Sequence, residues 1–326
     1  MQKIIPQKLQ KGDKVMIIAP SRGLKLIGQD CRQIATERLE KMGLRVEFAR
    51  NTTDENWNML GTGSVKQRAE DIMQAFQDQD VKGIFTVLGG FNSNQILDHL
   101  DYDVIRKNPK IICGFSDITA VLGAITAKTG LETYYGPHFS TLGMLKGCEY
   151  TLDCMQKMLF DDKPMMLQPA EEWSDDLWFL DQEKREFIKN EGFWILHNGD
   201  AEGTIVGGNL CTYNLLLGTS YQPKFEKNTI LMIEDDEESY PQAFDRNLQA
   251  LCHQPDFKNV TGLIIGRFQK KSKIDREMLT FIINNKPELK NIPVIANVDY
   301  GHTTPILTIP LGGHATISNG NIVIQK

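Results

Sequence analysis

Val15-Met16-Ile17-Ile18-Ala19 opens the stretch of sequence that decides the fold. This apolar run has the length of a buried strand. A helical pattern follows it and closes at Gly43, and Leu44-Arg45-Val46-Glu47-Phe48 is a second strand-like run. The helical pattern is carried by Cys31, Ile34, Ala35, Leu39 and Met42. A strand, a helix and a strand in this order predict a β-α-β unit with parallel strands.

The alternation of strands and helices continues through the first half of the chain. Ser64 and Gln67 have the spacing of a capping box at the start of a helix. Further strands are expected at residues 83–88 and 110–113, and further helices around residues 94–100 and from Thr119. This order is typical of a doubly wound α/β fold. We therefore predict that residues 1–165 form a flavodoxin-like or Rossmann-like domain with a parallel sheet.

The second half of the chain differs in composition and in its pattern of strands and helices. Residues 166–195 are rich in charged and aromatic side chains, and we interpret them as a linker or lid. In residues 196–326 helices are sparser and strand-like runs dominate, so we expect a strand-rich C-terminal α/β domain there. Its predicted strands lie at residues 203–206, 229–233, 263–265, 294–298 and 322–324.

Composition excludes several classes of protein. The 326 residues carry a formal net charge of -6, and the 36 Lys and Arg are scattered and outnumbered by 42 acids, so no nucleic acid polymer is expected as a partner. The N-terminus lacks the pattern of a secretory signal, and no apolar run approaches the length of about 20 residues that spans a bilayer, so no membrane contact is expected. The six cysteines form no C-x-x-C pair, which favours a reducing, cytoplasmic location and argues against a metal site.

A serine follows the strand expected at residues 110–113. Ile111-Ile112-Cys113-Gly114-Phe115-Ser116-Asp117-Ile118 is an apolar strand that ends in a Gly-x-Ser turn before a helix. Such a turn can expose Ser116 as a nucleophile, while the N–H of Asp117 can stabilise an oxyanion. The second glycine of the G-x-S-x-G motif is replaced by Ile118. The alternative is that Ser116 or Asp117 only caps the helix.

A glycine-rich loop ends the preceding strand. Gly89 and Gly90 free the backbone to approach a ligand, and either N–H could be the second oxyanion donor. The alternative is a simple turn capped by Asn92 or Ser93, and Ser93 is also a fallback nucleophile. No G-x-G-x-x-G motif follows the first strand, so no nucleotide cofactor is expected.

A base and a carboxylate complete a candidate catalytic triad. Among six histidines, only His302 lies in a Gly- and Pro-bounded loop directly after a strand, whereas His138 is interpreted as a surface or packing residue. Glu234 closes the strand at residues 229–233, where it would be held rigidly to orient an imidazole. The four acids after Glu234 are interpreted as a solvated or cation-attracting loop, and metal binding by them is the minor alternative, since no histidine is close in sequence. The order Ser116, Glu234, His302 is that of α/β-hydrolases.

The same residues resemble the LD-carboxypeptidases and their relatives, the microcin C self-immunity peptidases. The resemblance extends from Gly12 to Gly312 and rests on residues 89–94, 114–117, 136–137, 207–210, 233–235 and 301–302. It implies a flavodoxin-like N-terminal domain, a strand-rich C-terminal domain and a Ser116-Glu234-His302 triad between them. It also implies a homodimer, no metal or organic cofactor, and cleavage before a C-terminal residue.

The resemblance also suggests substrate contacts. Asn92, Asn209 and the Gly89-Gly90 loop are expected to line the pocket. The long aromatic loop is similar to that of immunity-type members, so Trp173 and Trp178 are expected to stack on a nucleobase or similar flat group. The alternative for both tryptophans is interdomain packing.

Three hypotheses for function follow. The first is hydrolysis of peptidyl or aminoacyl nucleotide antibiotics of the microcin C type. The second is removal of the terminal D-alanine from muropeptide tetrapeptides in cell-wall recycling. The third, from another class, is a non-catalytic binder of a small molecule that has kept the fold.

Overall fold

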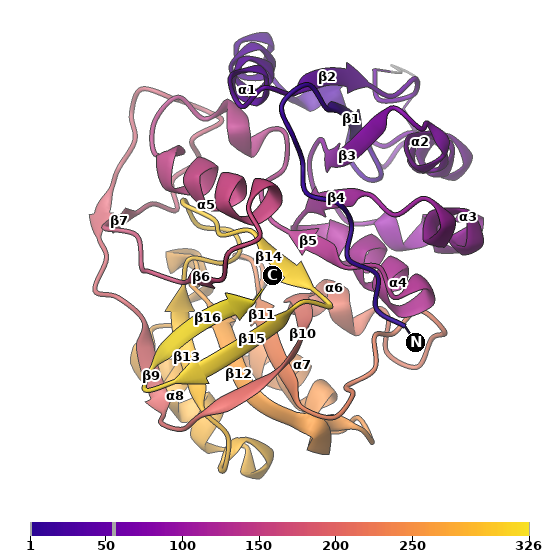
Figure 1. Ribbon diagram of the computed structural model, residues 1–326. Coiled ribbons are helices and arrows are strands. Elements are labelled where there is room, and N and C mark those ends of the chain that lie inside the picture. Colours follow the sequence, from indigo (N-terminus) through magenta and orange to yellow (C-terminus); the bar gives the residue numbers. More distant parts are fainter. Residues whose placement is uncertain (1, 54–56, 326) are drawn as a thin grey trace.

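The computed structural model describes residues 2–53 and 57–325, and its two main sheets lie beside each other (Figure 1). The first sheet has the strand order β14-β5-β4-β3-β1-β2. Its strands β1 to β5 are parallel, whereas β14 pairs antiparallel to β5. The bounds are β1 Lys14–Ile18, β2 Arg45–Phe48, β3 Val81–Thr86, β4 Ile111–Gly114, β5 Thr133–Tyr135 and β14 Ile309–Leu311. The predicted parallel sheet is therefore confirmed.

Five α-helices lie in the described part of the first half of the chain. They are α1 Gln29–Lys41, α2 Val65–Gln77, α3 Tyr102–Lys107, α4 Thr119–Thr129 and α5 Glu149–Phe160. The predicted capping box of α2 is present, because Ser64 Oγ accepts from the Gln67 N–H and the Gln67 side chain accepts from the Ser64 N–H. The helix expected around residues 94–100 is a 3₁₀-helix, Ser93–His99, and Asp101 then caps α3. No described helix combines the length and the apolar character needed to cross a bilayer.

The second sheet has eight strands in the order β6-β16-β15-β10-β11-β12-β13-β9. Strands β10 to β13 are parallel, and those beyond them on either side are antiparallel. The bounds are β6 Met165–Met166, β9 Trp194–His197, β10 Ala201–Asn209, β11 Thr229–Glu234, β12 Val260–Gly266, β13 Val294–Val298, β15 His314–Ser318 and β16 Asn321–Gln325. The α-helices among the described residues of this half are α6 Leu210–Asn214, α7 Pro241–Cys252 and α8 Arg276–Asn284.

The parallel strands of the second sheet are buried on both faces, which explains their continuous apolar sequences. Ile230 and Met232 of β11 belong to the core shared with the first sheet. Leu231 and Ile233 belong to a second core, which also contains Phe244 of α7. Glu234 therefore comes at the end of a strand that both cores hold in place.

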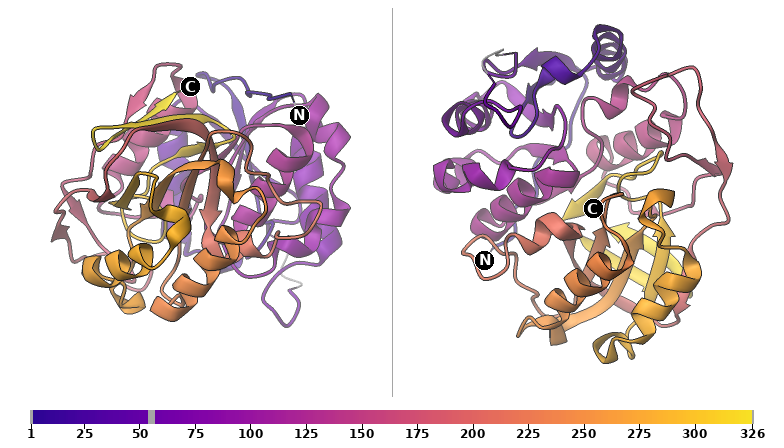
Figure 2. Two further views of the ribbon diagram at one scale, coloured as in Figure 1. Left: turned by 90° about the horizontal axis from the view of Figure 1, so that it is seen from below. Right: turned by 180° about the vertical axis from the view of Figure 1, so that it is seen from behind.

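The two halves exchange edge strands. Strand β6 follows α5 yet pairs with β16 in the second sheet, and β14 follows β13 yet pairs with β5 in the first sheet. Between β6 and β9 the chain arches over the outside of the molecule and forms a small hairpin of β7 Glu172–Trp173 and β8 Ile188–Lys189 (Figures 1 and 2).

A close backbone approach joins the two sheets at the end of β10. Gly208 has φ +127°, and a Cβ there would lie 2.6 Å from Cγ2 of Thr119. The Thr119 hydroxyl accepts a hydrogen bond from the N–H of Asn209 at 2.9 Å. Only glycine fits this contact between α4 and β10.

We expect Gly208→Ala to lower the free energy of unfolding by about 2 kcal/mol or more, because a methyl group would be both strained and overlapped with Thr119. Gly218→Ala is a matched control, since Gly218 has φ +75° but nothing within 4 Å of the added methyl group. Backbone strain alone should cost about 1 kcal/mol there. Urea unfolding measures both, and equal losses would contradict the close contact.

Candidate active site

The candidate residues meet where strands of both sheets end. Gly89 follows β3 and Ser116 follows β4, so both lie at the carboxyl edge of the first sheet. Glu234 ends β11, and His302 follows β13 at the carboxyl edge of the second sheet. Ligands of open α/β sheets bind at such edges.

Three side chains form one hydrogen-bonded row across this seam. His302 Nε2 lies 2.9 Å from Ser116 Oγ, and His302 Nδ1 lies 2.7 Å from Glu234 Oε2. The Glu234 side chain is fully buried, whereas that of His302 is 18% exposed. A hydroxyl, an imidazole and a carboxylate in this order have the geometry of a serine nucleophile with its base.

Two further donors hold the carboxylate of Glu234. Its Oε1 accepts hydrogen bonds from the hydroxyl of Tyr135 and, at 3.1 Å, from Nδ2 of Asn209. Burial, followed by the charge of Glu234, raises the pKa of Tyr135 well above its usual range, so the phenol stays protonated and donates. The orientation of Glu234 is therefore fixed before any substrate binds.

The carboxylate also sets the protonation of His302. Burial by itself would lower the pKa of His302, but the charge and the hydrogen bond of Glu234 outweigh it, and the charges of Asp236 and Asp235 add to them. The pKa of His302 is raised from 6.5 to about 9. The ion pair with Glu234 thus stabilises the imidazolium that would form if His302 accepted a proton from Ser116.

Ser116 sits in a constrained turn. Its φ is +60°, a left-handed conformation that non-glycine residues adopt seldom and mostly where function requires it. The N–H of Ser116 donates to the Tyr135 hydroxyl at 3.0 Å. A strained serine between a strand and a helix is the feature expected of a nucleophile elbow.

Asp117 connects the loops around the nucleophile. Its buried Oδ2 accepts from the hydroxyl of Ser21 at 2.6 Å and from the N–H groups of Asn92 and Ser93 at 3.0 and 2.9 Å. Its carbonyl accepts from the Ser93 hydroxyl. Ser93 is therefore buried and engaged, which removes the basis for treating it as a fallback nucleophile.

The glycine loop lies against Ser116. A Cβ on Gly89 would be 3.0 Å from Ser116 Oγ, and one on Gly90 would be 2.2 Å from Ser21 Oγ. Both glycines and Ser116 line one cleft of about 350 Å³. The backbone at Gly89 is thus close to Ser116, whereas Gly90 lies against Ser21 on the same cleft, and Asp117 lies in the 3₁₀ turn that begins at Ser116.

The residues that were expected to contact a substrate do not all line the cleft at Ser116. Trp178 lines the cleft together with Phe179, whereas Trp173 lines a separate pocket, where Arg267 stacks on its ring at 5.2 Å. Asn92 is buried outside the cleft lining, with its amide donating to Thr62.

Asn209 is also buried outside the lining of the cleft and bonds to Glu234. Its observed contacts, like those of Asn92, are the contacts of a residue that positions others.

Sequence reasoning missed two residues of the site. Tyr135 links Ser116 to Glu234, and His138 is buried and lines the cleft rather than the surface. Both lie at the end of β5, whose three residues are too few to give a strand pattern. The available signal was Gly136-Pro137, a motif that immediately follows this strand.

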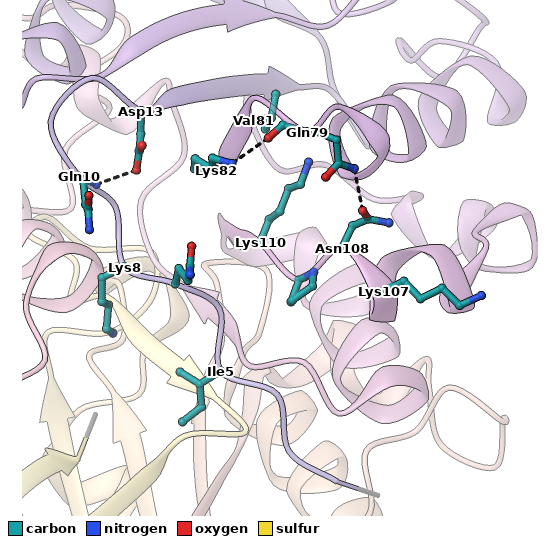
Figure 3. A pocket seen from close by; sticks show the side chains of 12 residues that line it. Ile5, Lys8, Gln10, Asp13, Gln79, Val81, Lys82, Lys107, Asn108 and Lys110 are labelled. Atoms are coloured by element: carbon teal, nitrogen blue, oxygen red, sulfur yellow. Dashed lines mark hydrogen bonds between the residues drawn. The ribbon is translucent and has the colours of Figure 1, made fainter.

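A second hollow of about 460 Å³ lies at the opposite edge of the first sheet (Figure 3). It is rich in lysines, and the amines of Lys8, Lys82 and Lys110 donate to backbone carbonyls. Its lining within the described chain contains no serine, cysteine or histidine. The described lining of the larger hollow therefore offers no hydroxyl or thiol nucleophile paired with an imidazole, and the candidate active site is the cleft at Ser116.

Comparison with protein families identifies the class. The chain matches the LD-carboxypeptidase N-terminal domain over residues 15–136 and the LD-carboxypeptidase C-terminal domain over residues 202–317. It belongs to this family of peptidases.

Individual relatives cover nearly the whole chain. A protein of Treponema pallidum (strain Nichols) named "Putative carboxypeptidase" is 50% identical over 94% of this chain and 89% of its own length. The crystal structure of an MccF-like protein from Bacillus anthracis str. Ames has a TM-score of 0.96 at 47% identity and covers 99% of both chains. The microcin C7 self-immunity protein MccF of Escherichia coli is 30% identical over 99% of this chain and 96% of its own length. A structure of MccF in complex with aspartyl sulfamoyl adenosine has a TM-score of 0.89 and covers 99% of this chain and 98% of that one.

The raised pKa of His302 predicts a pH dependence. If His302 acts as a base, it must be neutral to take a proton, so kcat/KM should rise with pH and reach half its maximum above 6.5, towards about 9. In Glu234→Gln the charge that raises the pKa is lost while burial remains, so the midpoint should move to lower pH and the maximum should fall. Profiles of kcat/KM for both proteins test this, and an unchanged midpoint would contradict the assigned cause.

Proposed function

We propose that this chain is a serine carboxypeptidase-type amide hydrolase in which Ser116 is the nucleophile, His302 the base and Glu234 the orienting carboxylate. The observation that carries the proposal is the continuous row of contacts from Ser116 Oγ to His302 at 2.9 Å and from His302 to Glu234 at 2.7 Å. Membership in a peptidase family supports the same reaction.

The reaction follows from the positions of these groups. His302 takes the proton of Ser116 as its oxygen attacks the scissile carbonyl, and the resulting oxyanion is held by N–H groups of Asp117 and the Gly89-Gly90 loop. Each such donor contributes on the order of 3 kcal/mol to transition-state stabilisation. His302 then protonates the leaving amine, and water releases the acyl group from Ser116. No step requires a metal or an organic cofactor.

The proposed substrate is a peptidyl or aminoacyl nucleotide of the microcin C type. Trp178 and Phe179 form an aromatic wall of the cleft, where a nucleobase could stack. The relative MccF has been solved with aspartyl sulfamoyl adenosine, a ligand of this chemistry. The alternative is a muropeptide tetrapeptide that loses its terminal D-alanine, and the LD-carboxypeptidase name of both matching domains favours it.

The proposed setting is the cytoplasm, and the proposed assembly is a homodimer. All six cysteines carry free thiols, and five of them are buried, which supports a reducing compartment. The dimer rests on family resemblance, and sedimentation of the purified protein would test it.

Ser116→Ala should reduce turnover by about 10⁴-fold or more, because loss of the nucleophile removes the covalent route. Ser93→Ala is the control, since it deletes another buried hydroxyl of the same loops and should retain most activity. Mass spectrometry of both proteins with aspartyl sulfamoyl adenosine and with a muropeptide tetrapeptide reports the products.

Each outcome of that experiment selects one hypothesis. Exclusive release of D-alanine would reject the nucleotide substrate in favour of the alternative. Full turnover by Ser116→Ala would reject the serine mechanism. An unmutated protein that binds the ligands but cleaves neither would be a non-catalytic binder.

Replacement of Trp178 and of Trp173, the two tryptophans expected to stack on a flat group, should have different effects on the KM for a nucleotide substrate. Trp178→Ala should raise KM about 10-fold or more, because base stacking on an aromatic ring contributes about 1–3 kcal/mol. Trp173→Ala removes an equal ring from the neighbouring pocket and should change KM much less. Steady-state kinetics of both variants decide this, and equal effects would contradict stacking in the cleft.

A further inference from the structure

His138 presents an unpartnered nitrogen to the cleft. The residue is 1% exposed, and its ring stacks on Phe115 with centroids 4.2 Å apart. Its Nδ1 lies 2.7 Å from the hydroxyl of Thr86, but its buried Nε2 has no hydrogen-bond partner within the described chain. Native proteins leave few buried polar atoms unpaired, and such an atom in a binding cleft indicates a partner that arrives with the ligand.

The free nitrogen lies beside the nucleophile. The point where a Cβ of Gly89 would stand is 3.0 Å from Ser116 Oγ and 3.4 Å from His138 Nε2. Ser116, His138 and Gly89 therefore surround one small space, and all three line the cleft. A substrate whose carbonyl carbon is attacked by Ser116 must place its neighbouring groups within reach of His138.

The hydrogen bonds of Thr86 fix which groups His138 can bind. Thr86 has one hydroxyl proton, and its oxygen contacts both the carbonyl of Cys113 at 3.3 Å and Nδ1 of His138. Both contacts are hydrogen bonds only if Thr86 donates to Cys113 and accepts from a protonated Nδ1. In a neutral imidazole Nε2 is then an acceptor.

The imidazole is also kept neutral. Burial, followed by the nearby charge of His302, lowers the pKa of His138 from 6.5 to about 3. His138 is thus a poor base at neutral pH, but its lone pair remains available to a hydrogen-bond donor.

We infer that His138 is a substrate-binding residue whose Nε2 accepts a hydrogen bond from an N–H group adjoining the scissile carbonyl. Two such groups exist in the proposed substrates, the N–H of the scissile amide and the free amine of the acyl residue. The inference rests on the proposed function, because it assumes that Ser116 attacks an amide in this cleft.

Two variants test whether the acceptor nitrogen of His138 or only the shape of its side chain matters for activity. His138→Met keeps an apolar side chain of similar reach and should lower kcat/KM for an amide substrate by about 10- to 100-fold, the effect of one lost hydrogen bond. His138→Gln can place an acceptor oxygen near the position of Nε2 and should recover most of that loss. Labelling of Ser116 by a fluorophosphonate, which has no N–H group, reports separately whether each variant has folded with a reactive serine.

Two substrate analogues identify the donor. One is the ester in which oxygen replaces the scissile N–H, and the other lacks the free amine. The ratio of kcat/KM between His138→Met and the unmutated protein is measured with each, so the intrinsic reactivity of the analogue cancels. The ratio should return to within about threefold of unity only for the analogue that lacks the responsible N–H.

Equal losses on the parent substrate and on both analogues, or no loss on the parent, would overturn the inference. A higher kcat/KM for the amide substrate in His138→Met than in His138→Gln would also overturn the inference. Failure of the proposed function would be recognised differently, because Ser116→Ala would then retain full turnover.

Discussion

The buried carboxylate of Glu234 is the interaction on which the site depends. A charge without solvent is stable only when it is paired and hydrogen-bonded, and three groups meet this need, the imidazole of His302, the phenol of Tyr135 and the amide of Asn209. Each group comes from a different part of the chain. The same carboxylate therefore positions the imidazole of His302, connects through Tyr135 to the backbone of Ser116, and links the two sheets.

Glycines make this convergence sterically possible. A Cβ on Gly301 would lie 2.3 Å from Oε2 of Glu234, and one on Gly266 would lie 2.7 Å from its Cβ. Neither neighbour of the carboxylate can therefore carry a side chain. Gly89 has the same role on the other side, where it leaves room at Ser116 for a ligand.

The parts of the molecule that sequence predicted are those governed by local patterns. The parallel strands and the capping box at Ser64 follow from apolar runs and from side chains three residues apart, and the Ser116, Glu234 and His302 side chains lie together as the family resemblance implied. Strands β5 and β14 have three residues each, and their pairing depends on tertiary contact, so no sequence pattern predicted them. For His138 the surface alternative was wrong and the packing alternative holds, because the residue is buried and its ring stacks on Phe115. Its place beside the cleft follows from the position of β5 and could not be predicted for the same reason.

The exchange of edge strands has a consequence for the whole molecule. Strand β14, from the C-terminal half of the chain, forms an edge of the sheet that carries Ser116, and β6, from the N-terminal half, forms an edge of the other sheet. Each half thus contributes an edge strand to the sheet of the other. Separating the halves would leave both sheets with an unpaired edge. The fold behaves topologically as one interlocked body, so the distance between serine and histidine is set by the architecture itself and does not depend on a swinging linker.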